Sequence, residues 1–294
     1  MESEGTWHNF TLQLAWAAGL FDGEGCSSAR RQRRKANALR IQASVSQSSH
    51  SAEVVPSVLV RFQRAVGGLG YIGAPYLDER SGTFAYQWRA GSYEEAQAVI
   101  ALLWANLGTV KRAQAADAFG RFRAQYETIR PLYRTPTRSR RLSVALPGPA
   151  ASAREQRLAW AAGLFDGEGS TELHTRRTLA RTWFSLRSRV SQCDAQGVPE
   201  VLRRFRAAVG CGRIDGPTSG EGYENAYKWD AGADDTLRVL PMIWPWLGIV
   251  KRVQAIDAIK SIDALPVLRR HPWRDEALRF GQLHTETSGN SLTV

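Results

Sequence analysis

The sequence is poor in the residues that staple small secreted proteins or cross membranes. Its three cysteines, Cys26, Cys193 and Cys211, lie far apart and form no CxxC pair. We therefore expect neither a disulfide framework nor a structural zinc, and a reducing intracellular compartment, either a bacterial cytoplasm or an organelle, fits best. No stretch approaches the roughly 18 uncharged apolar residues of a spanning helix. The polar start MESEGTWHNF is not expected to be a signal peptide.

Acidic residues are scarce relative to basic ones. There are 39 lysines and arginines against 28 aspartates and glutamates, which gives a net charge of +11. An excess of this size indicates a polyanionic partner, with nucleic acid favoured over an anionic membrane. Hydrophobic residues make up 43% of the chain, so there is enough apolar surface for a packed core.

A twelve-residue string, LAWAAGLFDGEG, occurs twice, at 14–25 and at 158–169. The two halves stay in step afterwards, because LGTVKRAQAADA from Leu107 matches LGIVKRVQAIDA from Leu247. A repeat this long indicates duplicated domains and not a solenoid. We expect an N-terminal module over 1–129, a basic proline-containing linker over 130–157, a C-terminal module over 158–281 and a disordered tail over 282–294.

The predicted linker has four prolines and seven arginines against one acid, Glu155. Proline and charge at this density disfavour a helix or a packed core. We interpret the segment as a solvated tether, with direct contact to a DNA backbone as the alternative.

Both modules predict the same order of elements. The doubled string is rich in strong helix formers and is predicted to be a helix. In the first module, strands follow at about 26–35 and 38–48, a helix at about 53–66, strands at about 70–77 and 83–90, and helices at about 92–106 and 109–128. The prediction is an α+β fold of two tandem pseudo-symmetric αββαββα modules, each with an antiparallel sheet that forms a DNA-binding saddle.

The second predicted strand alternates strictly between apolar and polar residues. Ile41 and Val45 fall on one face, while Arg40 and Gln42 fall on the other, so one face packs on helices and one stays wet. Arginine, glutamine, serine and histidine on a wet face can hydrogen-bond DNA bases and phosphates. The predicted DNA-contacting residues are Ser28, Arg30, Gln32, Arg34, Arg40, Gln42, Ser44, Gln87 and Arg89, and in the second module His174, Arg176, Ser185, Arg187, Arg189 and Lys228.

Small residues recur along the doubled string at spacings of three and four, so they share one helix face. Such a stripe allows close approach of another helix, and the natural partner is the same stripe of the other copy. The predicted interface residues are Ala15, Ala18 and Gly19 with Ala159, Ala162 and Gly163. This packing would set Glu24 and Glu168 near each other, and paired carboxylates bind hard divalent cations.

The string AAGLFDGEG resembles the signature of the LAGLIDADG homing endonucleases, with glutamate in place of the signature's second aspartate. The resemblance covers both modules almost end to end and is to the single-chain, two-motif type. It implies a homing endonuclease, or meganuclease, that cuts both strands of a long asymmetric double-stranded DNA site by metal-dependent hydrolysis and leaves a short staggered end. It also implies a monomer that needs no protein partner.

The resemblance assigns roles to particular residues. In the family, the last acid of each motif binds the catalytic metals, and a glutamine and a lysine lie near the reacting phosphate. The metal implied is Mg²⁺ or another divalent cation such as Mn²⁺, while Ca²⁺ could bind without supporting cleavage. The metal-binding residues implied are Glu24, Glu168, Gly23 and Gly167, and the catalytic residues are Glu24, Glu168, Gln47, Gln192, Lys111 and Lys251.

Other functions stay open at this point. A DNA-binding regulator that has lost cleavage is one, although the intact Glu24 and Glu168 argue against it. An RNA-splicing maturase, a role of some members of the family, is another. We also expect structural roles for several residues: capping by Asp22 and Asp166, core packing by Trp88 and Trp229, and buried thiols at the three cysteines.

Overall fold

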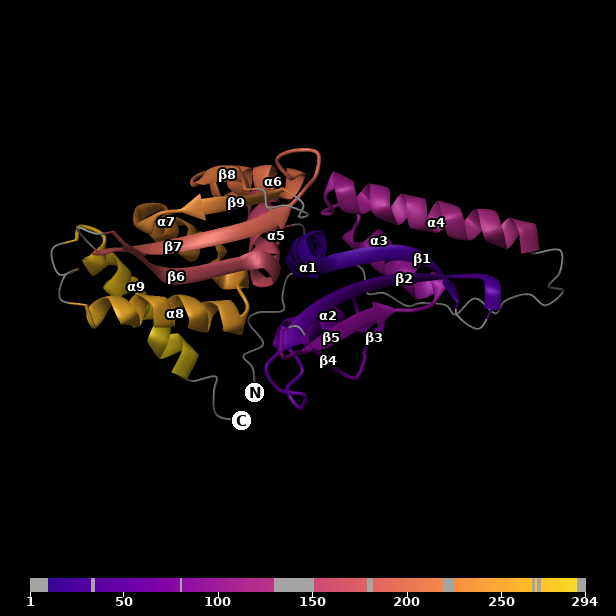
Figure 1. Ribbon diagram of the computed structural model, residues 1–294, viewed down its shortest axis with the longest axis horizontal. Coiled ribbons are helices and arrows are strands. Elements are labelled where there is room, and N and C mark those ends of the chain that lie inside the picture. Colours follow the sequence, from indigo (N-terminus) through magenta and orange to yellow (C-terminus); the bar gives the residue numbers. More distant parts are fainter. Residues whose placement is uncertain are drawn as a thin grey trace. The chain divides into compact units, whose positions relative to one another are not determined.

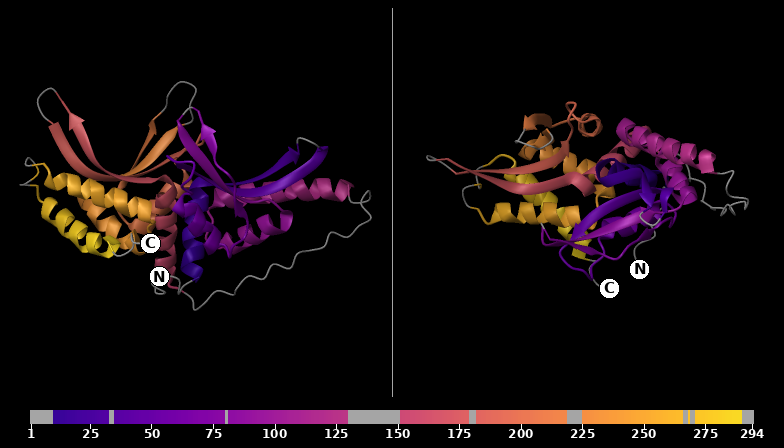
Figure 2. Two further views of the ribbon diagram at one scale, coloured as in Figure 1. Left: turned by 90° about the horizontal axis from the view of Figure 1, so that it is seen from below. Right: turned by 45° about the vertical axis from the view of Figure 1, so that its right-hand side comes forward.

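The computed structural model describes residues 10–32, 35–79, 81–129, 151–178, 182–218, 225–265, 268 and 271–289. The chain divides into two compact units, Asn9–Ser152 and Ala153–Val294, which are called the N-terminal and C-terminal units below. Each unit holds one antiparallel sheet (Figure 1). Figure 2 shows that the helices of each unit cover one face of its own sheet and leave the other face uncovered by helices.

The N-terminal unit has a single sheet with strand order β1-β2-β5-β3, and β4 also pairs with β5. All four pairings are antiparallel. The elements are α1 (Phe10–Glu24), β1 (Gly25–Gln32), β2 (Lys35–Ser49), α2 (Ser57–Ala65), β3 (Tyr71–Ile72), β4 (Tyr76–Asp78), β5 (Thr83–Ala90), α3 (Tyr93–Leu103) and α4 (Thr109–Ile129).

The C-terminal unit repeats this topology with strand order β6-β7-β9-β8. One helix, α9, follows the repeated part. The elements are α5 (Ala153–Glu168), β6 (Gly169–Arg177), β7 (Thr182–Cys193), α6 (Glu200–Val209), β8 (Arg213–Thr218), β9 (Ala226–Ala231), α7 (Ala233–Ile243), η3 (Trp244–Trp246), α8 (Ile249–Asp263) and α9 (Arg274–Gly289). The prediction of an α+β fold with two antiparallel sheets is confirmed.

Two prolines explain where the elements of the N-terminal unit depart from prediction. The helix expected from residue 53 begins at Ser57, because Pro56 is its cap and has an extended ψ of 121°. The residue before a proline, here Val55, rarely adopts helical φ and ψ angles because it would clash with the proline ring. The strand expected over 70–77 is split into β3 and β4 on either side of Gly73, Ala74 and Pro75, and proline has no N–H for a strand ladder.

The expected disordered tail is wrong for residues 282–289, because α9 continues to Gly289. The aromatic rings of Phe280 and His284 on this helix lie 5.0 Å and 4.6 Å from the ring of Trp244, which gives α9 a packed face. The expected linker also ends sooner than predicted, since α5 begins at Ala153. Residues 130–150 and 290–294 lie outside the described residues. Among the described helices, none combines the length and hydropathy of a membrane span.

Two fully buried tryptophans occupy matching places in the two cores, as predicted. Trp88 packs edge-to-face on Phe62, and Trp229 packs in the same way on Phe205, both at 4.8 Å between ring centroids. Their indole N–H groups donate to the carbonyls of Leu69 and Cys211. A tryptophan ring can be buried on a strand face at little cost when its one polar group, the indole N–H, has a hydrogen-bond acceptor.

The prediction of three buried thiols is wrong for Cys193, which is exposed in the last position of β7, while Cys26 and Cys211 are half-buried. None of the three is in a disulfide. Burial, followed by the charge of Asp235, raises the pKa of the Cys211 thiol. This thiol therefore stays protonated at neutral pH and is a poor nucleophile.

A buried aspartate near the end of α1 holds the start of α4. Both carboxylate oxygens of Asp22 accept a hydrogen bond from the Gly108 amide at 2.9 Å. Asp166 binds the Gly248 amide in front of α8 with the same distances. The first N–H groups of a helix lack partners within it and favour negative charge. The predicted capping role is confirmed. Asp22 of α1 caps α4, and Asp166 of α5 caps α8, so neither aspartate caps its own helix.

The glycine at this contact follows from the closeness of the carboxylate. A Cβ atom on Gly248 would lie 3.0 Å from both oxygens of Asp166. A larger residue would push the carboxylate off the amide. This accounts for one of the repeated Leu-Gly pairs that precede α4 and α8.

We expect Asp166→Ala to lower the free energy of unfolding by about 1–3 kcal/mol, because it removes a helix cap and leaves a buried amide without its acceptor. Urea unfolding of the full chain measures this loss. Asp257→Ala is the matched control, because Asp257 is exposed in the middle of α8. An equal loss in both variants would contradict the capping role.

His284 predicts a pH dependence of stability. Burial, followed by the charge of Arg252, lowers the pKa of this histidine. The His284 side chain therefore takes up a proton more readily in the unfolded chain than in the folded chain. Protonation thus favours unfolding, so the folded state is most stable above about pH 6.5 and loses stability as the pH falls below it. We expect the unfolding temperature to drop more between pH about 7.5 and 5.5 in the wild type than in His284→Phe, which keeps an aromatic ring. Equal drops would contradict this assignment.

Candidate functional site

In each unit the doubled helix passes into a strand without an intervening loop. A Cβ atom at Gly25 would lie 2.4 Å from the carbonyl oxygen of Phe21, and one at Gly169 would lie 2.5 Å from that of Phe165. No real Cβ fits so close to backbone, so glycine is required at both turns. The turn fixes the preceding glutamate, Glu24 or Glu168, at the junction between helix and sheet.

Two further predicted residues of the N-terminal unit gather at this junction. The Gln47 side-chain amide donates to Glu24 Oε1 at 2.8 Å. Lys111 Nζ donates to the Gly25 carbonyl at 2.5 Å. We call Glu24, Gly25, Gln47 and Lys111 the N-terminal acid–lysine cluster.

The bond between Asp22 and Gly108 explains how Lys111 reaches the cluster. It places the first turn of α4 beside the end of α1. Lys111 is the third residue of α4 and is therefore held within reach of the Gly25 carbonyl. The cluster thus joins segments that are 86 residues apart in the chain.

The C-terminal unit builds a matching cluster. Lys251 Nζ donates to the Gly169 carbonyl at 2.6 Å. Gln192 lies opposite Tyr227 in the sheet, as Gln47 lies opposite Tyr86. We call Glu168, Gly169, Gln192 and Lys251 the C-terminal acid–lysine cluster. The structure therefore brings Glu24, Gln47 and Lys111 together at one junction and Lys251 beside Glu168 at the other, with Gln192 at the register position of β7 that matches Gln47.

The donor atoms at the junctions suit a hard divalent cation. Each cluster presents a carboxylate, and Gly23 lies in the last turn of α1, where carbonyls lack partners within the helix. In a continuing helix the Gly23 carbonyl would accept a hydrogen bond from the Ser27 amide, four residues further on. That amide donates instead to Gln114 Oε1 at 3.3 Å. Carboxylate and carbonyl oxygens are the ligands that Mg²⁺ prefers, so the residues present fit the implied metal.

Side chains alone would not complete such a coordination shell. In the part of the chain that the structure describes, no three histidine, cysteine, aspartate or glutamate side chains gather into a metal-binding group. Mg²⁺ is commonly held by one or two carboxylates, with water and phosphate oxygens as its other ligands. The clusters match that sparse pattern, and the metal roles of Glu24, Glu168, Gly23 and Gly167 stay predictions.

The predicted DNA-contacting residues of the N-terminal unit lie on one face of its sheet. Arg30 stands opposite Arg40, and Ser44 stands opposite Arg89; residues directly opposite in an antiparallel pair share a face. Ser28 pairs with Gln42 in the same way, and Gln87 donates to Ser46 at 3.0 Å. Ser44 is itself nearly covered, with 6% exposure. Arg34 and the side chain of Gln32 lie outside the described residues.

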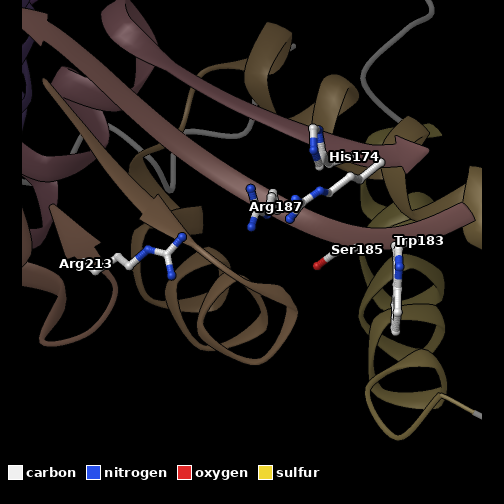
Figure 3. A pocket seen from close by; sticks show the side chains of 6 residues that line it. His174, Trp183, Ser185, Arg187 and Arg213 are labelled. Carbon is white, nitrogen blue, oxygen red and sulfur yellow. The ribbon is translucent and has the colours of Figure 1, made fainter. Parts of the chain in front are cut away.

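The equivalent face of the C-terminal unit contains a hollow of about 420 Å³ (Figure 3). Four of its lining residues, His174, Arg176, Ser185 and Arg187, were predicted to contact DNA. Trp183 and Arg213 were not predicted. Trp183 is 53% exposed and stands opposite Arg176. Its alternation with Ser185 and Arg187 along β7 is the sequence signal that could have identified it.

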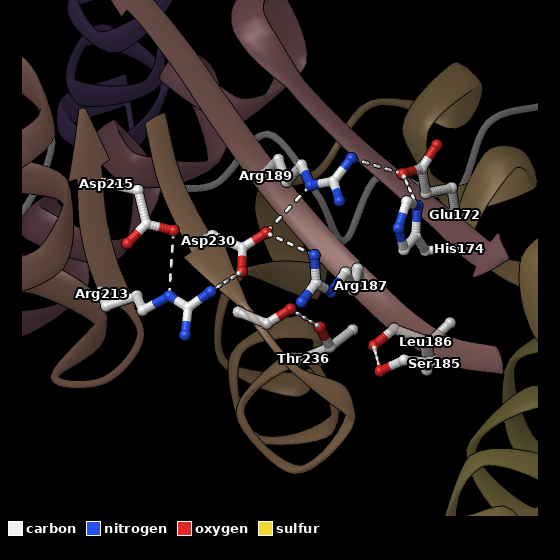
Figure 4. Close-up of polar contacts among 11 residues, drawn as sticks. Glu172, His174, Ser185, Leu186, Arg187, Arg189, Arg213, Asp215, Asp230 and Thr236 are labelled. Atoms are coloured by element: carbon white, nitrogen blue, oxygen red, sulfur yellow. Dashed lines mark hydrogen bonds and ion pairs between the residues drawn. The ribbon is translucent and has the colours of Figure 1, made fainter. Parts of the chain in front are cut away.

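Three acids on this face, Glu172, Asp215 and Asp230, were not among the predicted DNA-contacting residues. Figure 4 shows them joined to the arginines of the face. Arg189 binds Asp230 at 2.9 Å and Glu172 at 2.6 Å. The two remaining predicted contacts of this unit are Arg189, which is held by two acids, and Lys228, which stands opposite Ser191.

Similarity to known proteins was found at the level of structure. No family model matches the sequence, and no curated protein matches it. The LAGLIDADG homing endonuclease I-GzeII in complex with its DNA target is 16% identical with a TM-score of 0.56, and the match covers 92% of this chain and 97% of that chain. The LAGLIDADG meganuclease I-AabMI bound to uncleaved DNA is 15% identical with a TM-score of 0.58, over 85% and 91% of the two chains.

A third structure is I-SmaMI bound to uncleaved DNA in the presence of calcium ions. It is 14% identical with a TM-score of 0.54, and the match covers 92% of this chain and 98% of that chain. At identities this low, the structural similarity shows a shared fold and nothing more, and it extends over both units. The chain has the fold of the single-chain, two-domain LAGLIDADG homing endonucleases.

Proposed function

We propose that this protein is a sequence-specific endonuclease that cuts both strands of a long, asymmetric double-stranded DNA site. The reaction is metal-dependent hydrolysis that leaves a short staggered end. The observation that carries the proposal is the duplication of the acid–lysine cluster, once in each unit, on the fold that the three DNA-bound homing endonucleases share. Two strands require two cuts, and one chain supplies two equivalent clusters, so we propose that it acts as a monomer.

The helix-free faces of the two sheets are the proposed DNA-contacting surfaces. They carry the arginines and polar side chains described above, and the whole chain has a net charge of +11. Positive charge supplies affinity for the phosphate backbone, while side chains that reach base edges supply sequence preference. Because the two faces carry different residues, the target is expected to be asymmetric. A homodimer would be directed toward a palindrome.

Within each cluster the residues have distinct proposed roles. The Gln47 amide holds the Glu24 carboxylate in one orientation, and the lysine ammonium of Lys111 or Lys251 places positive charge beside the junction where a phosphate would lie. Glu24 and Glu168, with the carbonyls of Gly23 and Gly167, would hold Mg²⁺ or Mn²⁺, and Ca²⁺ is expected to bind without supporting cleavage. Such a cation lowers the pKa of water and neutralises charge that develops on a phosphate.

We expect the double variant Glu24→Gln plus Glu168→Gln to cut DNA at least about 100-fold more slowly than the wild type, since loss of mere outer-shell partners already costs about 10–100-fold. The measurement is incubation with Mg²⁺ and a genomic or randomised double-stranded library, followed by sequencing of the cut ends. DNA binding should persist, because these glutamates lie at the junctions and not on the predicted DNA-contacting faces.

The matched control is Glu53→Gln plus Glu276→Gln, which removes two exposed acids, one from each unit. This control should cut at the wild-type rate. Tight binding by the wild type without any cut would instead indicate a DNA-binding regulator. If the protein neither binds nor cuts DNA but binds intron RNA, it would be a maturase.

We expect Lys111→Met and Lys251→Met each to slow cutting by about 100-fold or more without loss of folding, because methionine keeps most of the side-chain volume but loses the charge near the phosphate. Single-turnover cleavage of the site identified above measures this effect. Lys260→Met, in the last turn of α8, is the control. Wild-type rates in both cluster variants would remove lysine from the proposed chemistry.

A further inference from the structure

The two sheets carry opposite charges at one equivalent position. Arg89 follows the buried Trp88 in β5, and Asp230 follows the buried Trp229 in β9. Arg89 stands opposite Ser44, whereas Asp230 stands opposite Arg189 on one side and Arg213 on the other. The repeat therefore kept the tryptophan and changed the residue that faces away from the core.

Asp230 is the centre of an ion-pair network that spans three strands (Figure 4). One carboxylate oxygen lies 2.9 Å from Arg189 Nε and 3.6 Å from an Arg187 nitrogen. The other lies 3.5 Å from an Arg213 nitrogen. Its side chain is only 3% exposed, so solvent weakens these attractions much less than at an open surface.

The three arginines are not equivalent. Arg189 is bound by Asp230 and by Glu172, and it does not line the hollow of Figure 3. Arg187 and Arg213 both line the hollow of Figure 3, and the Arg213 side chain is 65% exposed. The Arg187 Nε is buried and has no hydrogen-bond partner among the described residues. Asp215 also binds Arg213, at 3.0 Å. Of the three arginines around Asp230, Arg187 and Arg213 are the two that line the hollow and can meet a ligand there.

We propose that Asp230 is a positioning residue that fixes Arg187 and Arg213 to read guanine in the half of the target contacted by the C-terminal unit. This inference rests on the proposed function. An arginine fork donates two hydrogen bonds to guanine O6 and N7, the commonest specific contact in the major groove. A freely moving arginine binds phosphates equally well, and phosphate contacts carry no sequence information.

Holding the guanidinium groups before DNA arrives lowers the cost of ordering them on binding, which favours the contact that needs exact geometry. Asp230 also cancels part of the positive charge of the face, which weakens attraction to phosphates at every sequence. Both effects raise specificity and neither raises general affinity. Strands β1, β2 and β5 of the N-terminal unit carry no acid, so that half of the target serves as an internal reference.

The test is selection of bound DNA from a randomised double-stranded library by the full-length protein, followed by sequencing. The variants are Asp230→Asn, Glu172→Gln and Arg213→Gln. Arg213→Gln identifies the positions that the C-terminal unit reads, because this exposed side chain can be changed with little effect on folding. Glu172→Gln removes one charge from the same network but leaves the contacts of Asp230 with Arg187 and Arg213 in place.

We expect Asp230→Asn to lose about tenfold or more of the preference for guanine at the positions that Arg213→Gln affects, and to keep the preferences of the other half. General affinity should rise, with a steeper dependence on salt, because one balancing charge is gone. Glu172→Gln should show the salt effect and keep the guanine preference. Thermal unfolding checks that each variant is folded, and Asp230→Glu, whose longer side chain displaces the carboxylate, replaces Asp230→Asn if the latter does not fold.

Unchanged guanine preference in the folded Asp230 variant would overturn the proposal. So would an equal loss in Asp230→Asn and Glu172→Gln, because that would be a general effect of charge. A wild type that selects no sequence would overturn the proposed function itself. A wild type that selects a site without guanine at the positions affected by Arg213→Gln would overturn only the role of Asp230.

Discussion

The hydrogen bond between an aspartate carboxylate and a glycine amide, made once in each unit, is the constraint on which both clusters depend. Asp22 lies two residues before the glutamate of its own helix, and it holds the start of a helix that begins at Thr109. Lys111 follows three residues after Gly108 in the chain. This one hydrogen bond therefore sets the position of the lysine ammonium group relative to the Glu24 carboxylate. Asp166 and Gly248 repeat the arrangement with Lys251. A predicted metal ligand and a structural cap are thus separated by one residue in the string DGE.

The two units agree in their clusters and differ in their sheet faces. The junction geometry is the same to within about 0.1 Å in the bonds that both units make. On the faces, an arginine in one unit is replaced by a buried aspartate in the other, and a network of ion pairs grows around it. This pattern is what duplication followed by divergence of the sheet faces would produce, with the junctions retained and the exposed strand residues changed.

Much of the fold could be predicted from the sequence, because the repeat and the alternation along single strands are local signals. Glu24, Gln47 and Lys111, which lie together at one junction, were singled out through the resemblance of the repeated string to a known signature, and their catalytic roles stay predictions. The network around Asp230 was not found, since alternation identifies the face of a residue but not the residues opposite it on neighbouring strands. Likewise the ordered helix after residue 282 depends on its contact with Trp244, which is 40 residues away from His284 in the chain and leaves no local pattern.

Cleavage of the protein backbone by bound iron shows whether the glutamates at the two junctions hold a divalent cation. Fe²⁺ takes oxygen ligands and, with ascorbate and peroxide, generates radicals that cut the chain beside the metal. If both glutamates bind metal, we expect fragments that end near Glu24 and near Glu168, suppressed by excess Mg²⁺ and absent when both glutamates are replaced by glutamine. Fragments that end elsewhere, or that persist in the glutamine variant, would contradict it.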